Sequence, residues 1–86
     1  MTTEKLAFAH IRVPDKQKFN DITSEASRTY RFPGDELVVI KGPVAINVSR
    51  AGGHRVIDDE GKTHYVPKGW IELVWQAKDG QPHIVF

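Results

Sequence analysis

Turn-forming residues recur at short, even intervals from residue 33 onward, and this spacing limits the fold more than any other feature of the chain. They form pairs or clusters rich in glycine, proline and aspartate: Pro33-Gly34, Gly42-Pro43, Ala51-Gly52-Gly53, Asp58–Gly61, Pro67–Gly69 and Asp79-Gly80. Proline fixes φ, and glycine accepts the positive φ that tight turns require. Turns about 8–12 residues apart are typical of short strands in a sandwich or barrel. The sequence therefore predicts an all-β fold of six or seven short strands.

The intervals between the turns carry strand patterns. Glu36–Lys41 is apolar on both faces, so we expect a strand that is covered on both sides. Residues 44–49 alternate with a period of two, which predicts one solvent-facing side. Residues 54–57 and 63–66 flank an acidic turn that ends in glycine, which predicts a hairpin with a left-handed residue in its loop. Pro67–Gly69 then forms a kink or a single tight helical turn.

The two ends of the chain give weaker patterns. Leu6–Val13 is rich in apolar residues and predicts an opening strand, with its more uniformly apolar face (Ala7, Ala9, Ile11 and Val13) turned inward. Residues 15–20 read as a loop. Residues 21–27 are either a short helix capped by Asp21 or an extended arm, and a strand follows at residues 29–32. In the half-buried strand 71–76, Trp75 is in phase with Ile71 and Leu73 and is expected in the core. His83–Phe86 is expected as the last strand.

Length and composition set the class of protein. A chain of 86 residues forms one domain, here 1–86, and is short for a two-sheet sandwich of about 100 residues, so a small antiparallel barrel fits better. The sequence has no cysteine, which removes disulfides and favours the cytoplasm. We also expect no signal peptide and no membrane span, because no apolar run approaches the roughly 20 residues needed. A net charge of +1 argues against a strong phosphate-binding field.

Two segments resemble Src-homology-3 domains. Gly34-Asp35-Glu36-Leu37-Val38-Val39-Ile40 is similar to a strand of that family, and Tyr65-Val66-Pro67-Lys68-Gly69-Trp70-Ile71-Glu72-Leu73 is similar to its closing segment. The resemblance covers residues 32–73 and implies a small barrel. It also implies that Pro67 and Trp70 stand where the family has a groove proline and aromatic. The family's opening aromatic cluster and paired tryptophans have no counterpart here, so a proline-rich peptide groove of that kind is incomplete.

Metal and catalytic sites are not expected. His54 and His64 lie on the two arms of the predicted hairpin, and they share a face with a three-residue loop but not with a four-residue loop. Zinc needs three or four convergent ligands, and no third ligand is apparent. No serine lies in a nucleophile motif, and the chain has no glycine-rich phosphate loop. We therefore expect no metal, no cofactor and no enzymatic activity.

Aromatic and basic side chains gather around the hairpin and the kink that follows it. Tryptophan and tyrosine are favoured at binding hot spots, and Trp70 is either core or exposed. The candidate binding residues are Tyr65, Pro67, Trp70, Arg55, His54, His64, Lys68 and Arg50. The first hypothesis is a non-enzymatic protein-binding module, an adaptor, inhibitor or assembly component. The alternative is a small barrel that stacks and binds single-stranded nucleic acid through the same residues. Leu6–Val13 or His83–Phe86 could also pair with a partner or a second copy at a sheet edge.

Overall fold

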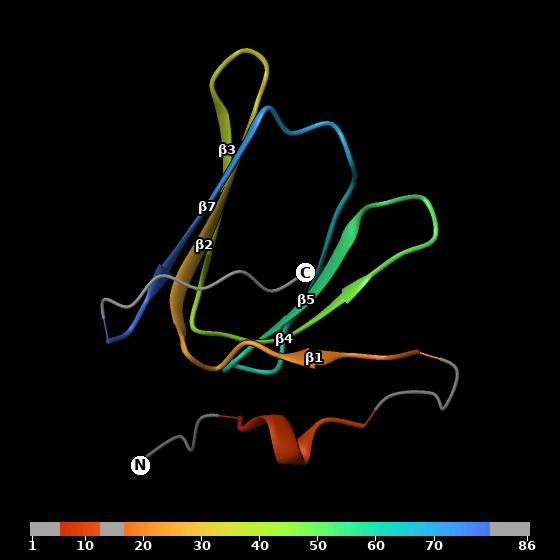
Figure 1. Ribbon diagram of the computed structural model, residues 1–86, viewed down its shortest axis with the longest axis vertical. Coiled ribbons are helices and arrows are strands. Elements are labelled where there is room, and N and C mark those ends of the chain that lie inside the picture. Colours follow the sequence, from red (N-terminus) through yellow and green to blue (C-terminus); the bar gives the residue numbers. More distant parts are fainter. Residues whose placement is uncertain (1–5, 13–16, 80–86) are drawn as a thin grey trace.

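The computed structural model describes residues 6–12 and 17–79, and these form two antiparallel sheets (Figure 1). In chain order the elements are the 3-10 turn η1 (Phe8–His10) and the strands β1 (Asn20–Asp21), β2 (Glu25–Phe32), β3 (Glu36–Lys41), β4 (Pro43–Val48), β5 (His54–Asp58), β6 (Thr63–Val66) and β7 (Glu72–Ala77). The strand order is β1-β4-β5-β6 in the first sheet and β3-β2-β7 in the second. The predicted all-β class with six or seven short strands is confirmed, since the described residues form seven.

The expected closed barrel is not present in the described residues. β6 ends the first sheet and β3 ends the second, and no strand pairing joins these two edges. The chain passes from one sheet to the other at Gly42-Pro43, where Gly42 has a φ of 62° and the register of β4 shifts. The result is two sheets that face each other and open on one side (Figure 1).

The core lies between the facing sides of the two sheets. Six buried side chains form it: Ile22, Tyr30, Ile40, Ile46, Val56 and Val66. Phe32, Val38, Trp70 and Leu73 are half-buried and pack against this cluster. Trp75 is half-buried too, so it borders the core and does not lie fully inside it as expected.

The turn chemistry read from the sequence is confirmed at two hairpins. Gly34 connects β2 to β3 with a φ of 85°. Gly61 has a φ of 84° in the loop between β5 and β6, where the N–H of Gly61 donates to the Asp58 carbonyl. The N–H of Asp58 also donates to the Lys62 carbonyl, so three residues separate the paired positions. Pro67–Gly69 is a bend without helical geometry.

The predicted opening strand at Leu6–Val13 is wrong. Residues 8–10 form η1, in which the N–H of His10 donates to the Ala7 carbonyl, and Ala7 and Ala9 are exposed. Alanine favours helical backbone and carries little apolar area, so it does not fix an inner strand face. Leu6 instead joins the β5–β6 loop through its N–H, which donates to the Asp59 carbonyl at 2.7 Å. The described residues do not include the end of this segment at Val13–Lys16, Gly80, or the expected last strand His83–Phe86.

Two predictions about strand faces are also wrong. β3 was expected to be covered on both sides, but Leu37 and Val39 are 57% and 51% exposed because no described element packs on the outer face of its sheet. β4 was expected to have one wet side, but Ala45 and Asn47 are buried. The segment before β1 covers that side, where the Asn47 side chain donates to the Lys18 carbonyl.

Residues 21–27 are not helical: Asp21 ends β1, residues 23 and 24 form a turn, and Glu25 begins β2. The Asp21 side chain accepts hydrogen bonds from the backbone N–H and the hydroxyl of Thr23, which forms a local turn before β2. In the described residues no helix is long and apolar enough to cross a membrane.

Candidate functional site

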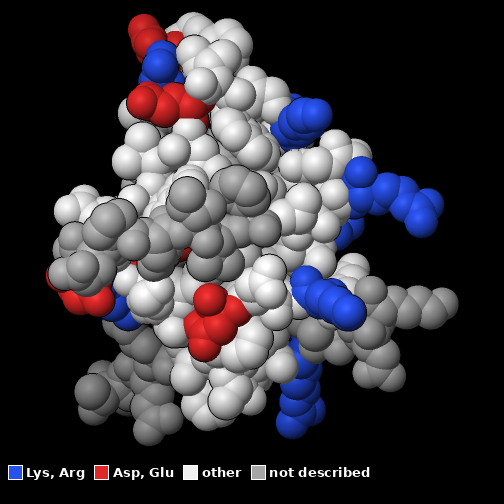
Figure 2. All heavy atoms as spheres, viewed as in Figure 1, with Lys and Arg blue, Asp and Glu red and all other residues white. Residues whose placement is uncertain are grey.

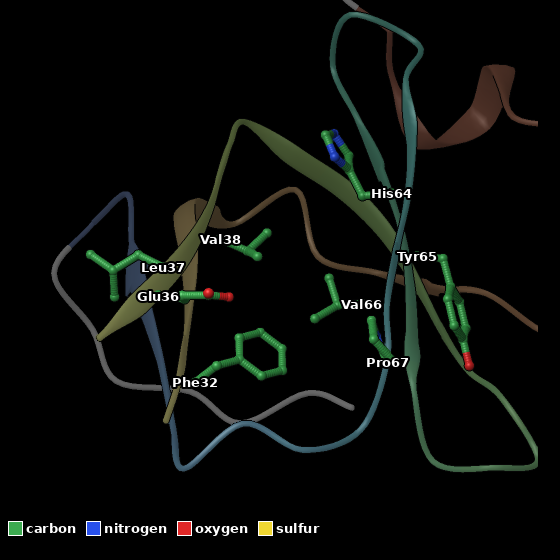
Figure 3. A pocket seen from close by; sticks show the side chains of 8 residues that line it. All are labelled: Phe32, Glu36, Leu37, Val38, His64, Tyr65, Val66 and Pro67. Carbon is green, nitrogen blue, oxygen red and sulfur yellow. The ribbon is translucent and has the colours of Figure 1, made fainter. Parts of the chain in front are cut away.

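An open groove of about 460 Å³ lies between the edge strands β3 and β6 (Figure 3). Its lining comes from the β2–β3 hairpin on one side and from β6 on the other: Phe32, Glu36, Leu37, Val38, His64, Tyr65, Val66 and Pro67. Strand alternation places Glu36 and Val38 on the inner side of β3, and His64 and Val66 on the inner side of β6. In Figure 3 Phe32, Val38 and Val66 point into the space, whereas Leu37 and Tyr65 point away from it.

Glu36 brings a carboxylate to this apolar space. Its side chain is exposed and, in Figure 3, extends from β3 toward Val66, between Val38 and Phe32. Within the described part of the chain, no ion pair or hydrogen bond engages this carboxylate. The groove therefore combines hydrophobic walls with one carboxylate that forms no ion pair within residues 6–12 and 17–79.

His64 and Asp58 form a fixed pair at the β6 side. The Nε2 atom of His64 lies 2.8 Å from Oδ2 of Asp58, and the backbone N–H groups of Glu60 and Lys62 both donate to Oδ1 at 2.9 Å. Burial alone would raise the pKa of Asp58, but these hydrogen bonds outweigh it and hold that pKa below its usual value. The pair stabilises the hairpin loop and orients the imidazole at the groove.

The eight predicted binding residues do not form one surface. His64, Tyr65 and Pro67 line the groove. Tyr65 also lies on the outer side of its sheet under Arg55, whose guanidinium carbon is 5.7 Å from the ring centre, and Arg55 donates to the Asn47 side chain. Lys68 and Arg50 are exposed, and the Lys68 side chain lies beside Gly52.

The other two predicted residues belong to the interior. Trp70 is half-buried, with its ring 5.0 Å from Tyr30 and 4.7 Å from His54. His54 is 4% exposed, and its Nδ1 atom lies 2.7 Å from the Tyr30 hydroxyl. Burial, and secondly the charge of Arg28, lower the pKa of His54 to about 4. His54 and His64 share the inner face, as the three-residue loop requires, but each ring has its own partner. Among the described residues, no three histidine, aspartate or glutamate side chains are grouped to hold a metal.

A buried ion pair near His54 was not predicted from the sequence. Glu25 and Arg28 are both fully buried, with Nε to Oε1 at 2.6 Å and Nη2 to Oε2 at 3.0 Å. Arg28 also donates to the Tyr30 hydroxyl at 3.4 Å and lies 5.0 Å from the Trp75 ring. Residues three apart on a regular strand point to opposite faces, but the bulge between Glu25 and Ser27 brings both side chains inward. The pair could have been predicted only from the bulge, and the bulge could not be recognised because its sequence contains no glycine or proline.

Basic side chains do not merge into a continuous patch on the face seen in Figure 2. There the lysine and arginine side chains stand apart from one another, separated by uncharged surface or lying against acidic side chains. A phosphate-binding surface needs several cations that act together, which this face does not offer.

Comparison with known proteins gives no relative for this chain. No protein-family model matches the sequence, and neither the curated proteins nor the solved structures contain a significant match.

Proposed function

We propose that this chain is a protein-binding module that holds an extended segment of another protein in the groove between β3 and β6. The observation that carries the proposal is the groove itself, an apolar space of about 460 Å³ bordered on both sides by sheet edges without a neighbouring strand in the described residues. Ligand sites are typically concave and mainly apolar, with a few polar groups that fix orientation. Extended peptides commonly bind proteins that present a free sheet edge beside such a space.

The shape and chemistry of the groove favour recognition over catalysis. It contains apolar side chains, one carboxylate and a histidine that is already bonded to Asp58. An extended segment presents side chains alternately to its two sides, so every second residue would enter the space between Phe32, Val38 and Val66. The binding energy would come from the apolar area that these residues cover.

The proposal is tested by selecting short random peptides, displayed on phage, for binding to the intact protein. The selected peptides are then measured against Pro67→Lys, which places an ammonium group at the groove, and against Val74→Lys. Val74 is 51% exposed and lies outside the groove, so it is a matched control. We expect Pro67→Lys to weaken binding at least about fivefold, as for loss of one contributing interface residue, and Val74→Lys to bind as the wild type does.

Other results would overturn the proposal. If no peptide is selected, or if both lysine variants bind equally well, the groove does not hold a protein segment. Retention of single-stranded DNA that is lost steeply as salt rises would instead favour a nucleic-acid function. The stacked pair Arg55 and Tyr65 would then be the first residues to test.

A further inference from the structure

The two edges of the groove differ in how open they are to another strand. β6 has four residues and is followed by Pro67, which has no N–H to donate. Short edges and edge prolines are common protection against unwanted strand pairing. β3 has six residues and carries Leu37 and Val39, which are both more than half exposed. Of the two edges that border the groove, β3 is therefore the less protected one in the described part of the chain.

The backbone of β3 offers groups to a new strand at alternate residues. The N–H of Gly42 donates to the Ala26 carbonyl, which makes this a hydrogen-bonded position of the β2–β3 pair. Hydrogen-bonded and non-hydrogen-bonded positions alternate in antiparallel pairs. The N–H and C=O groups of Ile40 and Val38 therefore point toward β2, and those of Leu37 and Val39 point toward the open edge.

The inner side of β3 sets which side chains a new strand should carry. Glu36 and Val38 lie on this side, two residues apart, next to the groove. Side chains on neighbouring strands lie about 5 Å apart when directly opposite. A residue opposite Glu36 would therefore meet a carboxylate, and one opposite Val38 would meet the apolar wall that Phe32 continues.

We propose that the occupant is an extended protein segment that pairs with the free edge of β3 and places a lysine or arginine beside Glu36 and an apolar side chain beside Val38. One residue separates the two in the partner, because a strand turns every second side chain to the same side. The intervening residue faces outward and covers part of Leu37, which lies between Glu36 and Val38. This inference rests on the proposed function and adds the edge and the charge of the partner.

The charge is tested by repeating the peptide selection on wild type, on Glu36→Lys and on Glu60→Lys. Glu60 is an exposed residue of the β5–β6 loop outside the groove, so it carries the same charge change as a control. We expect wild type and Glu60→Lys to enrich segments with a basic and an apolar residue separated by one position. We expect Glu36→Lys to lose this enrichment and to bind the wild-type peptides at least about fivefold more weakly.

The edge is tested with Val39→Pro and Thr63→Pro. Proline is tolerated on an edge strand where the N–H points outward, and it removes the donor that a new strand would use. Thr63 stands on the β6 edge. The N–H of Asp58 donates to the Lys62 carbonyl, so Lys62 is a hydrogen-bonded position, and by alternation the N–H of Thr63 points outward. Val39→Pro is expected to weaken peptide binding about tenfold or more, whereas Thr63→Pro leaves it unchanged. In the wild type, bound peptide should slow hydrogen exchange at the Leu37 and Val39 amides.

The outcomes separate this inference from the proposed function. If peptides bind and Pro67→Lys weakens them, but Glu36→Lys and Val39→Pro do not, the groove is a binding site and the β3 assignment is wrong. Protection of the Thr63 and Tyr65 amides in place of Leu37 and Val39 would also overturn it. If no peptide binds to the groove at all, both proposals fail.

Discussion

Replacement of Arg28 by methionine should lower the free energy of unfolding much more than replacement of an exposed arginine on the same strand. The guanidinium makes two hydrogen bonds to Glu25, at 2.6 and 3.0 Å, and both side chains are fully buried. Methionine fills much of the same volume but removes both hydrogen bonds that the guanidinium donates to the buried Glu25 carboxylate. Removing one partner of a buried ion pair typically costs about 3–5 kcal/mol.

That loss is large relative to the whole domain. A chain of 86 residues is expected to have a free energy of unfolding of about 4–13 kcal/mol, at roughly 0.05–0.15 kcal/mol per residue. Arg28→Met should therefore lose roughly a quarter or more of the stability, as measured by urea unfolding followed through tryptophan fluorescence. The double variant Glu25→Leu/Arg28→Met removes both charges, and we expect it within about 2 kcal/mol of the wild type.

The exposed pair Arg31 and Glu72 provides the control. Its Nε to Oε1 distance is 2.9 Å, similar to the buried pair, but the two side chains are 38% and 53% exposed. Arg31→Met should cost at most about 1 kcal/mol, because water screens the charges. The reasoning is refuted if Arg28→Met costs no more than Arg31→Met, or if the double variant is less stable than the Arg28 single variant.

Three further outcomes are expected. Because the pKa of His54 falls from 6.5 to about 4 on folding, the unfolded chain binds more protons between these values, so stability should drop as pH falls from about 6.5 to about 4. The loss should be on the order of 3 kcal/mol in urea unfolding and should be absent in His54→Gln; equal stability at pH 7 and pH 4.5 would contradict it. Tyr30→Phe should cost about 1–3 kcal/mol, because His54 and Arg28 lose the hydroxyl, and a loss below about 0.5 kcal/mol would count against that bond. Gly42→Ala should cost about 2 kcal/mol in thermal unfolding and more than Gly34→Ala, because both residues have positive φ but only at Gly42 would a Cβ meet the Asp59 carboxylate. Equal losses would show that backbone strain alone decides.

Strand positions were predictable because apolar runs, alternation and turn residues are local properties of the sequence. The apolar run at residues 36–41 and the two segments that flank the acidic turn, 54–57 and 63–66, were assigned within one residue of the observed strands. What covers each strand is not local, and the errors at β3 and β4 arose there. Leu37 and Val39 look like core residues in the sequence, yet the sheet that carries them has no described layer on its outer side.

The candidate groove was only partly predictable for the same reason. Its β6 wall, with His64, Tyr65 and Pro67, belongs to the aromatic cluster read from the sequence. Its other wall comes from Phe32, Glu36 and Val38, about thirty residues earlier, and no local pattern indicates that the two edges would face each other. The sequence could not show whether the Trp70 ring is exposed or buried, and in the structure the ring packs against Tyr30.

The position of β2 between β3 and β7 has a consequence for how the chain folds. β3 follows β2 after a short turn, whereas the Arg31–Glu72 contact joins β2 to β7 across 41 positions of sequence. Local hairpins close within microseconds, but distant pairing must first overcome the entropy of a large loop. The β2–β3 and β4–β5–β6 hairpins are therefore expected to form early, and β7 to dock last. During synthesis, β2 can pair with β7 only after nearly the whole described chain has been made. The rate of folding is therefore expected to depend on the docking of β7.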